Sequence, residues 1–338
     1  MKYLIEIHHG IGDVVQMTGV WETLYRMDKD ADIGVIINLY GRYELLRNDR
    51  RIKHIYLLNI HDMPKVQILK TVWMIRNYRY DYAFFSPISN QRDTRIFAAL
   101  IGAGITVGEQ FSDKTLSFRK YIHIKPENIH MVLRNQNLLI QSGIAKEAAE
   151  PRLEGIAGEF PELTKKVIGL CIGTKEKAKT WYLKRYMEIA EYYGKKGFQI
   201  ALIGGAAEKQ RFEESGFQAD PSYCFNYLGK LDMGESAALV GKCDVVIGGD
   251  TGVMHAAAAM GTVCVAIFTC TDPKLHRPYS PNCHVLTAGI DCQYCGYKSG
   301  FNQCTHFRCK KEITVGKVVE LVDSVLESLM EEHNGGYI

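Results

Sequence analysis

The sequence has no apolar run long enough to span a membrane, and no cleavable signal opens it. It also lacks an excess of charge of one sign, because 41 Lys and Arg residues stand against 38 Asp and Glu residues, a net charge of +3. A chain so balanced is not expected to bind nucleic acid. With 46% hydrophobic and 23% charged residues, the composition is that of a soluble globular protein. We therefore expect a cytoplasmic protein.

No internal repeat or low-complexity tract is present, and apolar runs instead alternate with helix-like segments along the 338 residues. Helical patterns include residues 13–25, 66–77 and 183–193. Strands that alternate with helices predict an α/β fold with two parallel sheets, each covered on both faces. The expected strands are residues 3–7, 33–37, 55–58, 82–85 and 106–108, followed by 167–171, 199–203, 244–248, 263–268 and 284–287.

The two series of strands are separated by a segment rich in proline and glycine, around Pro151, Gly155 and Pro161. This break predicts an N-terminal domain of residues 1–155 and a C-terminal domain of residues 156–313. The remaining residues, 314–338, carry apolar side chains on one face of a helix. That helix either packs on its own domain or crosses back to the first.

The most specific local pattern lies at residues 243–259, where a short apolar run leads through a glycine pair to Asp250-Thr251-Gly252 and then to a helix of small residues. The first turn of a helix has free backbone N–H groups and a partial positive charge, so Thr251 and Gly252 could hold a phosphate. His255 follows Thr251 by four residues and faces the same side. The alternative is a capped helix packed on a buried sheet.

A second pattern follows the first expected strand, where Gly10 and Gly12 allow a sharp turn before Asp13. Asp13 stands at a helix start, where the dipole favours the ionised carboxylate. Such a carboxylate can accept the proton of a sugar hydroxyl, although an ordinary capping aspartate is the alternative. Val15 occupies the place of the third glycine of a dinucleotide fingerprint, so a nicotinamide cofactor is poorly supported.

Two further loops follow strands of the second series. The loop at residues 173–181 contains three lysines and two threonines, among them Thr174 and Lys179, and suits phosphate contact unless it is simply a solvated charged loop. Trp181 argues against that alternative, because an aromatic side chain would anchor the loop against the following helix. Gly204 comes directly after the next strand and would let a ligand approach the backbone.

The ten cysteines are numerous, and four of them form the pattern Cys292-x2-Cys295-x8-Cys304-x4-Cys309. In a cytoplasmic protein, four thiols within so short a segment indicate a tetrahedral zinc or iron site. Two disulfides and free thiols are the alternatives. A metal with four thiolate ligands would be structural, because no coordination position stays open.

Taken together, these stretches resemble glycosyltransferase family 9, the bacterial heptosyltransferases. The resemblance covers nearly the whole chain. It is carried by the motifs Gly10-Ile11-Gly12-Asp13-Val14-Val15-Gln16-Met17-Thr18, Lys179-Thr180-Trp181, Asp250-Thr251-Gly252-Val253-Met254-His255 and Phe268-Thr269-Cys270-Thr271-Asp272-Pro273. The chain departs from the family's pattern at Gly19, Tyr182 and Cys270, positions that affect loop shape more than chemistry.

The resemblance implies two Rossmann-like domains that face a central cleft, the glycosyltransferase-B architecture. Members are inverting, metal-independent transferases that use ADP-heptose or a related nucleotide sugar. By this pattern, Asp13 would deprotonate the acceptor hydroxyl, and His255 would lie near the donor's phosphates or sugar. In a subgroup that glycosylates autotransporter proteins, four cysteines hold iron. The expected donor-binding residues are Thr174, Lys179, Gly204, Asp250, Thr251, Gly252 and His255.

The sequence therefore predicts an inverting glycosyltransferase that needs no cofactor for catalysis and moves a sugar, heptose by the resemblance, from an ADP-linked donor. A nucleotide-sugar epimerase of the same architecture and a non-catalytic sugar-nucleotide-binding scaffold are the alternatives. The acceptor is left open among a lipopolysaccharide core, another surface glycan, a protein and a small natural product. Peripheral association with the inner membrane and oligomer formation are both compatible with this interpretation.

Overall fold

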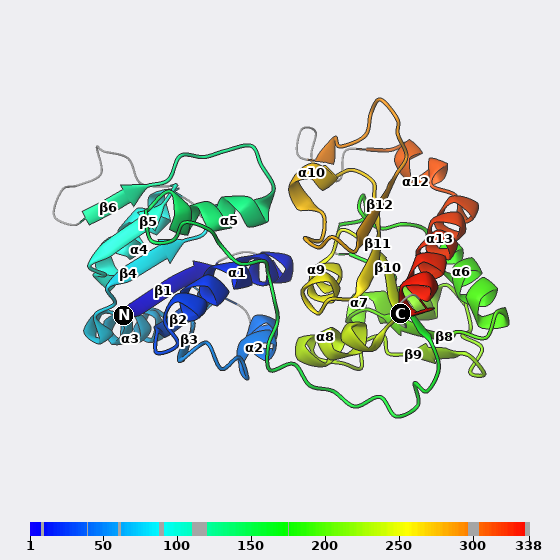
Figure 1. The fold of residues 1–338 in the computed structure, drawn as a ribbon, viewed down its shortest axis with the longest axis horizontal. Coiled ribbons are helices and arrows are strands. Elements are labelled where there is room, and N and C mark those ends of the chain that lie inside the picture. Colours follow the sequence, from blue (N-terminus) through cyan, green and yellow to red (C-terminus); the bar gives the residue numbers. More distant parts are fainter. Residues whose placement is uncertain are drawn as a thin grey trace. The chain divides into compact units, whose positions relative to one another are not determined.

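The computed structural model describes residues 1–7, 10–38, 40–59, 62–87, 91–109, 120–174, 176–296 and 304–334. The chain divides into two compact units. Unit 1 is Met1–Ala157 with Asp232–Glu235, and unit 2 is Gly158–Leu231 with Ser236–Ile338. Each unit contains a six-stranded parallel sheet with helices beside it (Figure 1). The predicted α/β fold with two parallel sheets is confirmed.

The sheet of unit 1 has the strand order β3-β2-β1-β4-β5-β6. Its chain order reverses between β1 and β4, and the carboxyl ends of the strands at such a point are where open α/β sheets bind ligands. The strands are β1 (Lys2–Ile7), β2 (Asp32–Ile37), β3 (His54–Leu57), β4 (Tyr82–Phe85), β5 (Ile105–Gly108) and β6 (Lys120–His123). The helices are α1 (Ile11–Met27), α2 (Tyr40–Leu46), α3 (Lys65–Tyr78), α4 (Gln91–Ile101) and α5 (Met131–Ile140).

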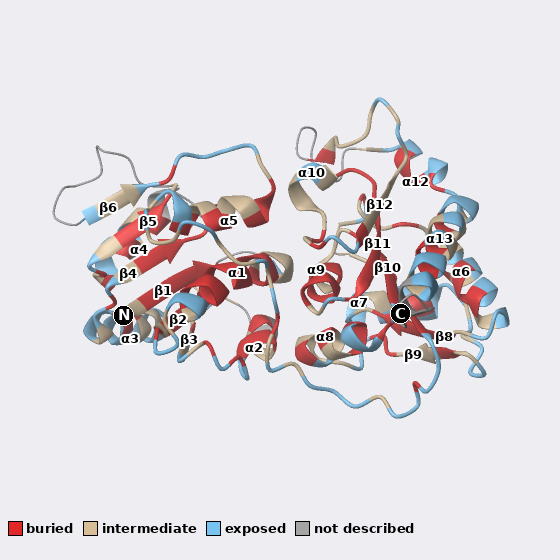
Figure 2. Ribbon diagram, viewed as in Figure 1, coloured by how far each residue is buried: buried red, intermediate tan, exposed pale blue. Residues whose placement is uncertain are grey.

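Unit 1 buries its central strands on both faces, which is why β1 and β2 are almost continuous apolar runs (Figure 2). On one side, α1 packs against α5. Helices α3 and α4 pack together and share a core in which Ile75 and Ala98 meet Leu4 of β1. The apolar positions that predict these helices are thus the ones that they bury.

The sheet of unit 2 has the order β12-β11-β10-β7-β8-β9, with the reversal between β7 and β10. Its strands are β7 (Val167–Cys171), β8 (Gln199–Ile203), β9 (Cys224–Asn226), β10 (Val245–Gly249), β11 (Val263–Phe268) and β12 (Cys283–Thr287). The helices in this part of the chain are α6 (Leu183–Lys195), α7 (Ala206–Glu214), α8 (Met233–Lys242), α9 (Gly252–Ala259), α10 (Pro273–His276), α12 (Arg308–Glu312) and α13 (Val315–Asn334).

The C-terminal helix α13 packs in unit 2. Val318, Val322 and Leu326 are buried in the same core as Ile189 of α6. At the edge of this contact, the hydroxyl of Tyr193 donates to Asp323 Oδ1 at 3.0 Å. The amphipathic pattern of the last helix therefore reflects burial against α6.

Two strands of the structure were not predicted. Both β6 and β9 are the last strands at one edge of their sheets. β9 has only three residues, and β6 has a Lys and a His at its ends and no fully buried side chain. Short or half-exposed edge strands lack the continuous apolar run that identifies a central strand. The other strands lie within one or two residues of the predicted ranges.

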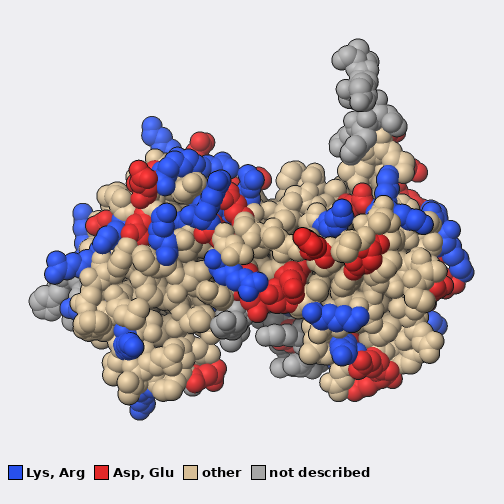
Figure 3. Space-filling model, turned by 90° about the horizontal axis from the view of Figure 1, so that it is seen from below, with Lys and Arg blue, Asp and Glu red and all other residues tan. Residues whose placement is uncertain are grey.

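The surface carries both signs of charge. On the face drawn in Figure 3, Lys and Arg side chains occur beside Asp and Glu side chains over both units, in keeping with the net charge of +3. A span across a membrane is not provided by any helix of the described ranges, because none is both long and apolar enough.

Candidate functional site

The candidate site of unit 2 lies where β7 and β10 end. These strands are neighbours, with Cys171 opposite Gly248, so the loops that follow them leave the sheet side by side. The loop after β7 carries Lys179, and the loop after β10 carries Asp250. The structure thus brings together two residues that the sequence predicted separately, at the reversal in strand order.

Lys179, Asp250 and His255 form a polar cluster that is mostly shielded from solvent. Lys179 Nζ lies 2.7 Å from Asp250 Oδ2, and His255 Nε2 lies 3.8 Å from Asp250 Oδ1. Burial by itself would raise the pKa of Asp250, but the polar contact with His255 and the positive charge of Lys179 hold that pKa well below its usual range. Asp250 is therefore ionised at physiological pH and orients both neighbours.

Helix α9 begins as predicted, directly after this carboxylate. Thr251 is its N-cap residue, and Thr251 Oγ1 accepts the N–H of Val253 at 3.2 Å. The N–H groups of Thr251 and Gly252 point out of the helix at such a start and suit an anion. Met254 and the alanines that follow are buried. The helix is thus capped and packed on the sheet, and that packing fixes its N-terminal end in place.

The loop after β7 is held by buried contacts. Thr269 Oγ1 donates to the carbonyl of Ala178 at 2.9 Å, and Thr174 Oγ1 donates to the carbonyl of Glu176 at 2.8 Å. Trp181 is buried, packs edge to face on Tyr186 of α6 and donates its ring N–H to a backbone carbonyl. The loop is therefore not a freely solvated charged segment, and both Thr174 and Lys179 lie close to Gly249 at the end of β10.

Gly204 follows β8, the next strand of the sheet. A side chain at this position would meet Glu208 Cβ at 2.6 Å and Leu228 Cδ2 at 3.0 Å. Glu208 Oε2 also accepts the N–H of Gly205 at 2.9 Å, which closes the first turn of α7. The glycine is thus required by the packing of α7 on β8, a reason that differs from the close ligand approach expected from the sequence.

In unit 1, Asp13 lies in the first turn of α1, directly after β1. Its Oδ2 accepts the backbone N–H of Gly10 at 2.5 Å, so the capping role considered from the sequence is present. The side chain is partly exposed. A carboxylate can accept more hydrogen bonds than the one from Gly10. Capping therefore leaves Asp13 able to accept a proton.

Arg42 is a polar residue near Asp13 that the sequence did not single out. It lies on α2, after β2, and the last residues of β2 and β1 are paired at Ile37 and Ile7. The side chain is only 5% exposed. Burial lowers the pKa of Arg42, and the charge of Asp13 acts in the opposite direction. The local sequence does not indicate that a single arginine in a short helix belongs to a site. Only the pairing of β1 with β2 shows that Arg42 lies near Asp13.

The four cysteines of the predicted metal site lie in or beside the last part of unit 2, and residues 297–303 between them fall outside the described ranges. No group of three or more His, Cys, Asp or Glu side chains within those ranges is placed to hold a metal ion. Several thiols nevertheless lie near Cys309. Burial raises the pKa of Cys309 to about 11, and the nearby thiols of Cys270, Cys304 and Cys295 add to that rise.

The position of Cys270 in this group was not predicted. The N–H of Gly296 donates to the carbonyl of Cys270 at 2.8 Å, which brings the segment around Cys295 to the end of β11. The described side chains thus form a loose thiol cluster and do not form the closed tetrahedral shell that the spacing predicts.

Comparison with known proteins identifies the family. The family model described as glycosyltransferase family 9 (heptosyltransferase) matches residues 71–306, more than half of the chain. The chain belongs to glycosyltransferase family 9. The site around Lys179 and Asp250 lies within the matched segment.

Among curated proteins, the chain is similar to lipooligosaccharide heptosyltransferase 2 of Haemophilus influenzae. The two are 28% identical over 176 residues, which are 51% of this chain and 49% of that protein. The chain therefore spans about half the length of the curated relatives that it matches first.

Solved structures extend the likeness of fold to nearly the whole chain. A glycosyltransferase family 9 protein from Veillonella parvula has a TM-score of 0.82 and 20% identity, with 97% of each chain covered. The ADP-heptose lps heptosyltransferase II of E. coli has a TM-score of 0.78 and 21% identity, with 98% of this chain and 100% of that chain covered. These structures share the two-sheet α/β architecture described above.

Proposed function

We propose that this family 9 chain is an inverting glycosyltransferase that moves heptose from ADP-heptose to a hydroxyl group of an acceptor. The observation that carries the proposal is the polar cluster of Lys179, Asp250 and His255 beside the start of α9. A lysine and a helix N-terminus at one sheet edge are the groups that a diphosphate requires. The name of the similar E. coli structure supports ADP-heptose as the donor.

On the donor side, Lys179 would stabilise the charge that develops on the departing diphosphate. Asp250 Oδ2 holds the Lys179 ammonium group at 2.7 Å, and the positive charge of that group would attract the phosphate oxygens. The N–H groups of Thr251 and Gly252 would complete the contact, together with the hydroxyl of Thr174 once it releases the carbonyl of Glu176. Because Asp250 is ionised and buried, it would hold Lys179 in position before the donor arrives.

On the acceptor side, Asp13 would act as general base. The acceptor oxygen forms a bond to the anomeric carbon of the sugar while its proton passes to the Asp13 carboxylate. The bond between that carbon and the diphosphate breaks, and ADP leaves with the electron pair. Direct displacement of this kind inverts the anomeric configuration, and the charges that it requires are all supplied by the protein.

The two parts of the chain would divide this work. Residues 1–155 would form the acceptor domain and residues 156–313 the donor domain, with residues 314–338 as a C-terminal helix. The name of the similar H. influenzae protein supports a surface glycan, such as the core of a lipopolysaccharide, as the acceptor. A protein acceptor is the second choice, and the protein would act in the cytoplasm.

We also propose that the protein associates with the surface of the inner membrane through α3. Val66, Leu69 and Trp73 lie on one face of this helix and are 78%, 65% and 64% exposed. Helix α4, which packs against α3, also exposes two apolar side chains, Ile96 and Leu100. A group of large exposed apolar side chains is typical of an interaction site.

The charge beside this apolar face favours an anionic lipid surface. Lys65, Lys70 and Arg76 are exposed on α3, and α3 contains no acidic residue. An apolar helix face flanked by basic side chains suits a bilayer of anionic lipids. Pairing with a second copy through the same face would bring like charges together, which is unfavourable. If the protein forms oligomers, another surface would therefore be used.

A structural zinc or iron ion at Cys292, Cys295, Cys304 and Cys309 remains a proposal. Its support is the spacing of the four thiols and the approach of Cys295 and Cys304 to Cys309. The role of such an ion would be to tie the segment after β12 to unit 2, since a metal can replace a missing core in a short segment. No step of the reaction depends on it.

The proposed reaction is tested by incubating the chain with ADP-heptose and a lipopolysaccharide core that lacks heptose, and by measuring ADP release and product by mass spectrometry. Transfer should require the acceptor, and Asp13→Asn should slow it by about 10²- to 10⁴-fold with ADP affinity little changed. Asn keeps an oxygen that can still accept the N–H of Gly10, so the cap is retained.

Three outcomes would contradict the proposal. Full transfer by Asp13→Asn would remove the residue as the base. Release of free heptose or an epimer without any acceptor would indicate the epimerase instead. ADP-heptose binding with no turnover on any acceptor tested would favour the scaffold.

A further inference from the structure

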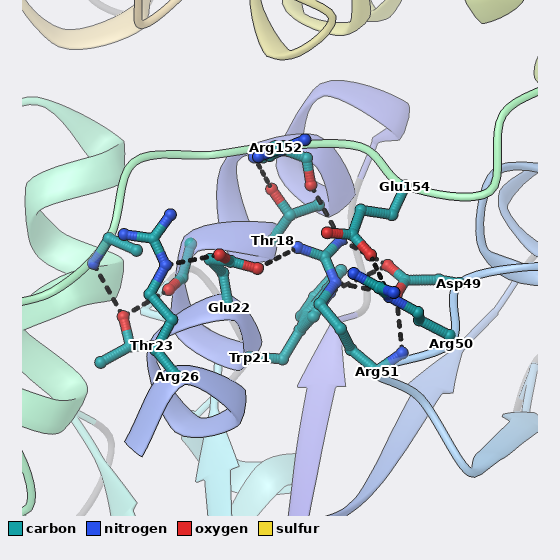
Figure 4. Close-up of polar contacts among 12 residues, drawn as sticks. Thr18, Trp21, Glu22, Thr23, Arg26, Asp49, Arg50, Arg51, Arg152 and Glu154 are labelled. Carbon is teal, nitrogen blue, oxygen red and sulfur yellow. Dashed lines mark hydrogen bonds and ion pairs between the residues drawn. The ribbon is translucent and has the colours of Figure 1, made fainter. Parts of the chain in front are cut away.

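Among the described residues of unit 1, two arginines are buried, and one of them is fully paired. Arg51 is 0% exposed and donates from Nε to Asp49 Oδ1 at 2.8 Å and from Nη1 to Glu22 Oε2 at 2.6 Å (Figure 4). Its Nη2 contacts the carbonyl of Arg152 at 2.9 Å. Every nitrogen of this guanidinium thus has an oxygen partner, as a buried charge requires.

The second buried arginine, Arg42, has no such partners. Its Nε and Nη1 are both buried, and neither has a hydrogen-bond partner in the structure. Within the described ranges, no Asp or Glu forms an ion pair with Arg42, and the charge of Asp13 reaches it only through space. A guanidinium keeps its charge inside a protein, so this arrangement is unfavourable in the free protein.

The position of Arg42 suggests why the arrangement persists. Asp13 follows β1, which borders the reversal in strand order of unit 1, and Arg42 follows β2, which pairs with β1. Ligands of parallel α/β sheets bind at this edge. Unpaired buried polar groups are rare in native proteins and call for an explanation, and a bound ion or ligand that supplies the missing partner is one.

We propose that Arg42 binds an oxyanion of the ligand, a carboxylate or a phosphate, at the edge of the sheet where Asp13 lies. The anion would take the N–H donors that the protein leaves unused and would align the neighbouring hydroxyl with Asp13. The inference rests on the proposed function only for the role of Asp13. The anion belongs either to the acceptor or to the diphosphate of the donor.

The test compares Arg42→Met with Arg51→Met in thermal unfolding, with and without inorganic phosphate and in the absence of ADP, so that no diphosphate occupies Arg42. Without phosphate, Arg51→Met should unfold at a clearly lower temperature, because Asp49 and Glu22 lose their partner. Arg42→Met should unfold at the same or a higher temperature than the wild type, because an unpaired charge is removed. Phosphate should raise the midpoint of the wild type by more than that of Arg42→Met.

Arg42→Lys serves as a second variant, because it keeps the charge and loses the planar donor group. It should retain only part of the phosphate response. A drop in midpoint for Arg42→Met comparable to that of Arg51→Met, or an equal phosphate response in the wild type and both variants, would overturn the proposal. If ADP does not bind at all, the proposed donor site fails while the phosphate comparison still stands.

Titration with ADP identifies the source of the anion. If the affinity for ADP is the same in Arg42→Met and the wild type while the phosphate response is lost, the anion is carried by the acceptor. If the affinity falls tenfold or more, Arg42 binds the diphosphate of the donor. Unchanged ADP binding together with an unchanged phosphate response excludes both sources.

Discussion

At the scale of single residues, the site in unit 2 depends on Asp250. This carboxylate is buried and lies between a lysine and a histidine that come from different segments of the chain. Lys179 and Asp250 are 71 residues apart in sequence. Removal of the carboxylate would take away the contact that holds Lys179 Nζ at 2.7 Å, at a position where both side chains are mostly shielded from water.

A dependence of stability on pH follows from Asp250. Its folded pKa lies well below its usual range, so the unfolded chain binds the proton first as pH falls. The stability that ionised Asp250 contributes is fully present above the ordinary pKa of about 3.9. It is lost progressively as pH falls from there towards the folded pKa. The free energy of unfolding, measured with urea between pH 7 and pH 3, should therefore fall less steeply for Asp250→Asn than for the wild type. Asp291→Asn, at an exposed position, should follow the wild type, and equal slopes for all three proteins would show that Asp250 does not contribute.

Single residues of the site were predictable to the extent that the local sequence carries a signal. Asp250 and Thr251 follow an apolar run and precede a helix of small residues, so both the strand and the helix start were found. The pairing of Lys179 with Asp250 depends on the order of strands in the sheet, which local pattern does not determine. Arg42 was missed for the same reason, and the packing reason for Gly204 depends on α7.

At the scale of secondary structure elements, α3 is the helix whose composition does not fit its surroundings. It buries Val72 and Ile75 and exposes larger apolar side chains on the opposite face. A helix that only covers a sheet would carry polar residues there. The exposed apolar face of α3, with the lysines beside it, is therefore expected to bind a partner.

The fluorescence of Trp73 can report directly on contact with a lipid surface. The chain has three tryptophans, and Trp21 and Trp181 are buried, so a change in fluorescence on binding would come mainly from Trp73. Vesicles of phosphatidylethanolamine and phosphatidylglycerol should shift the emission to shorter wavelengths, and phosphatidylcholine vesicles should not. The shift should weaken with added salt, because the lipid contact is partly electrostatic.

Two matched variants complete this experiment. Leu69→Glu places a charge on the apolar face of α3 and should abolish co-sedimentation with anionic vesicles. Met330→Glu, at an exposed apolar position of α13, should leave it unchanged. Co-sedimentation of Leu69→Glu at the wild-type level would refute the membrane surface, as would an oligomer that dissociates when Leu69 is replaced.

The central strands of both sheets could be predicted because they are buried on both faces and read as apolar runs. The edge strands β6 and β9 could not, because their pairing partners rather than their own residues make them strands. Among the helices, α1, α3 and α6 were found from their apolar spacing. Short helices such as α2 have too few turns to show a period.

At the scale of the whole molecule, the chain forms two α/β units, each with a parallel sheet. A cysteine-rich segment and a last helix follow the strands of unit 2. The segment after β12 has a small core, because Gly296, Cys309, Lys310 and Ile313 are the only buried residues among its described residues from 296 to 314. A segment of this kind is stabilised by a metal ion more than by packing.

The metal proposal is tested by elemental analysis of protein purified under reducing conditions without chelator. About one zinc or iron ion per chain is expected, because four thiolates form one closed site. Cys304→Ser should lose the ion and unfold at a lower temperature, whereas Cys283→Ser, in β12 and outside the cluster, should keep the ion. Metal-free wild-type protein would show that the cluster holds free thiols or disulfides.

The central claim is that unit 2 binds a nucleoside diphosphate through Lys179 and the start of α9. Calorimetric titration with ADP tests it most directly, in the wild type, Lys179→Ala and Lys177→Ala. The exposed Lys177 lies two residues away in the same loop and serves as the matched control. Loss of the Lys179 contact should weaken ADP binding by about 10- to 150-fold, because a charge-assisted contact contributes about 1.5–3 kcal/mol, and Lys177→Ala should bind like the wild type. No binding of ADP to the wild type at millimolar concentration, or equal affinities in all three proteins, would contradict the claim.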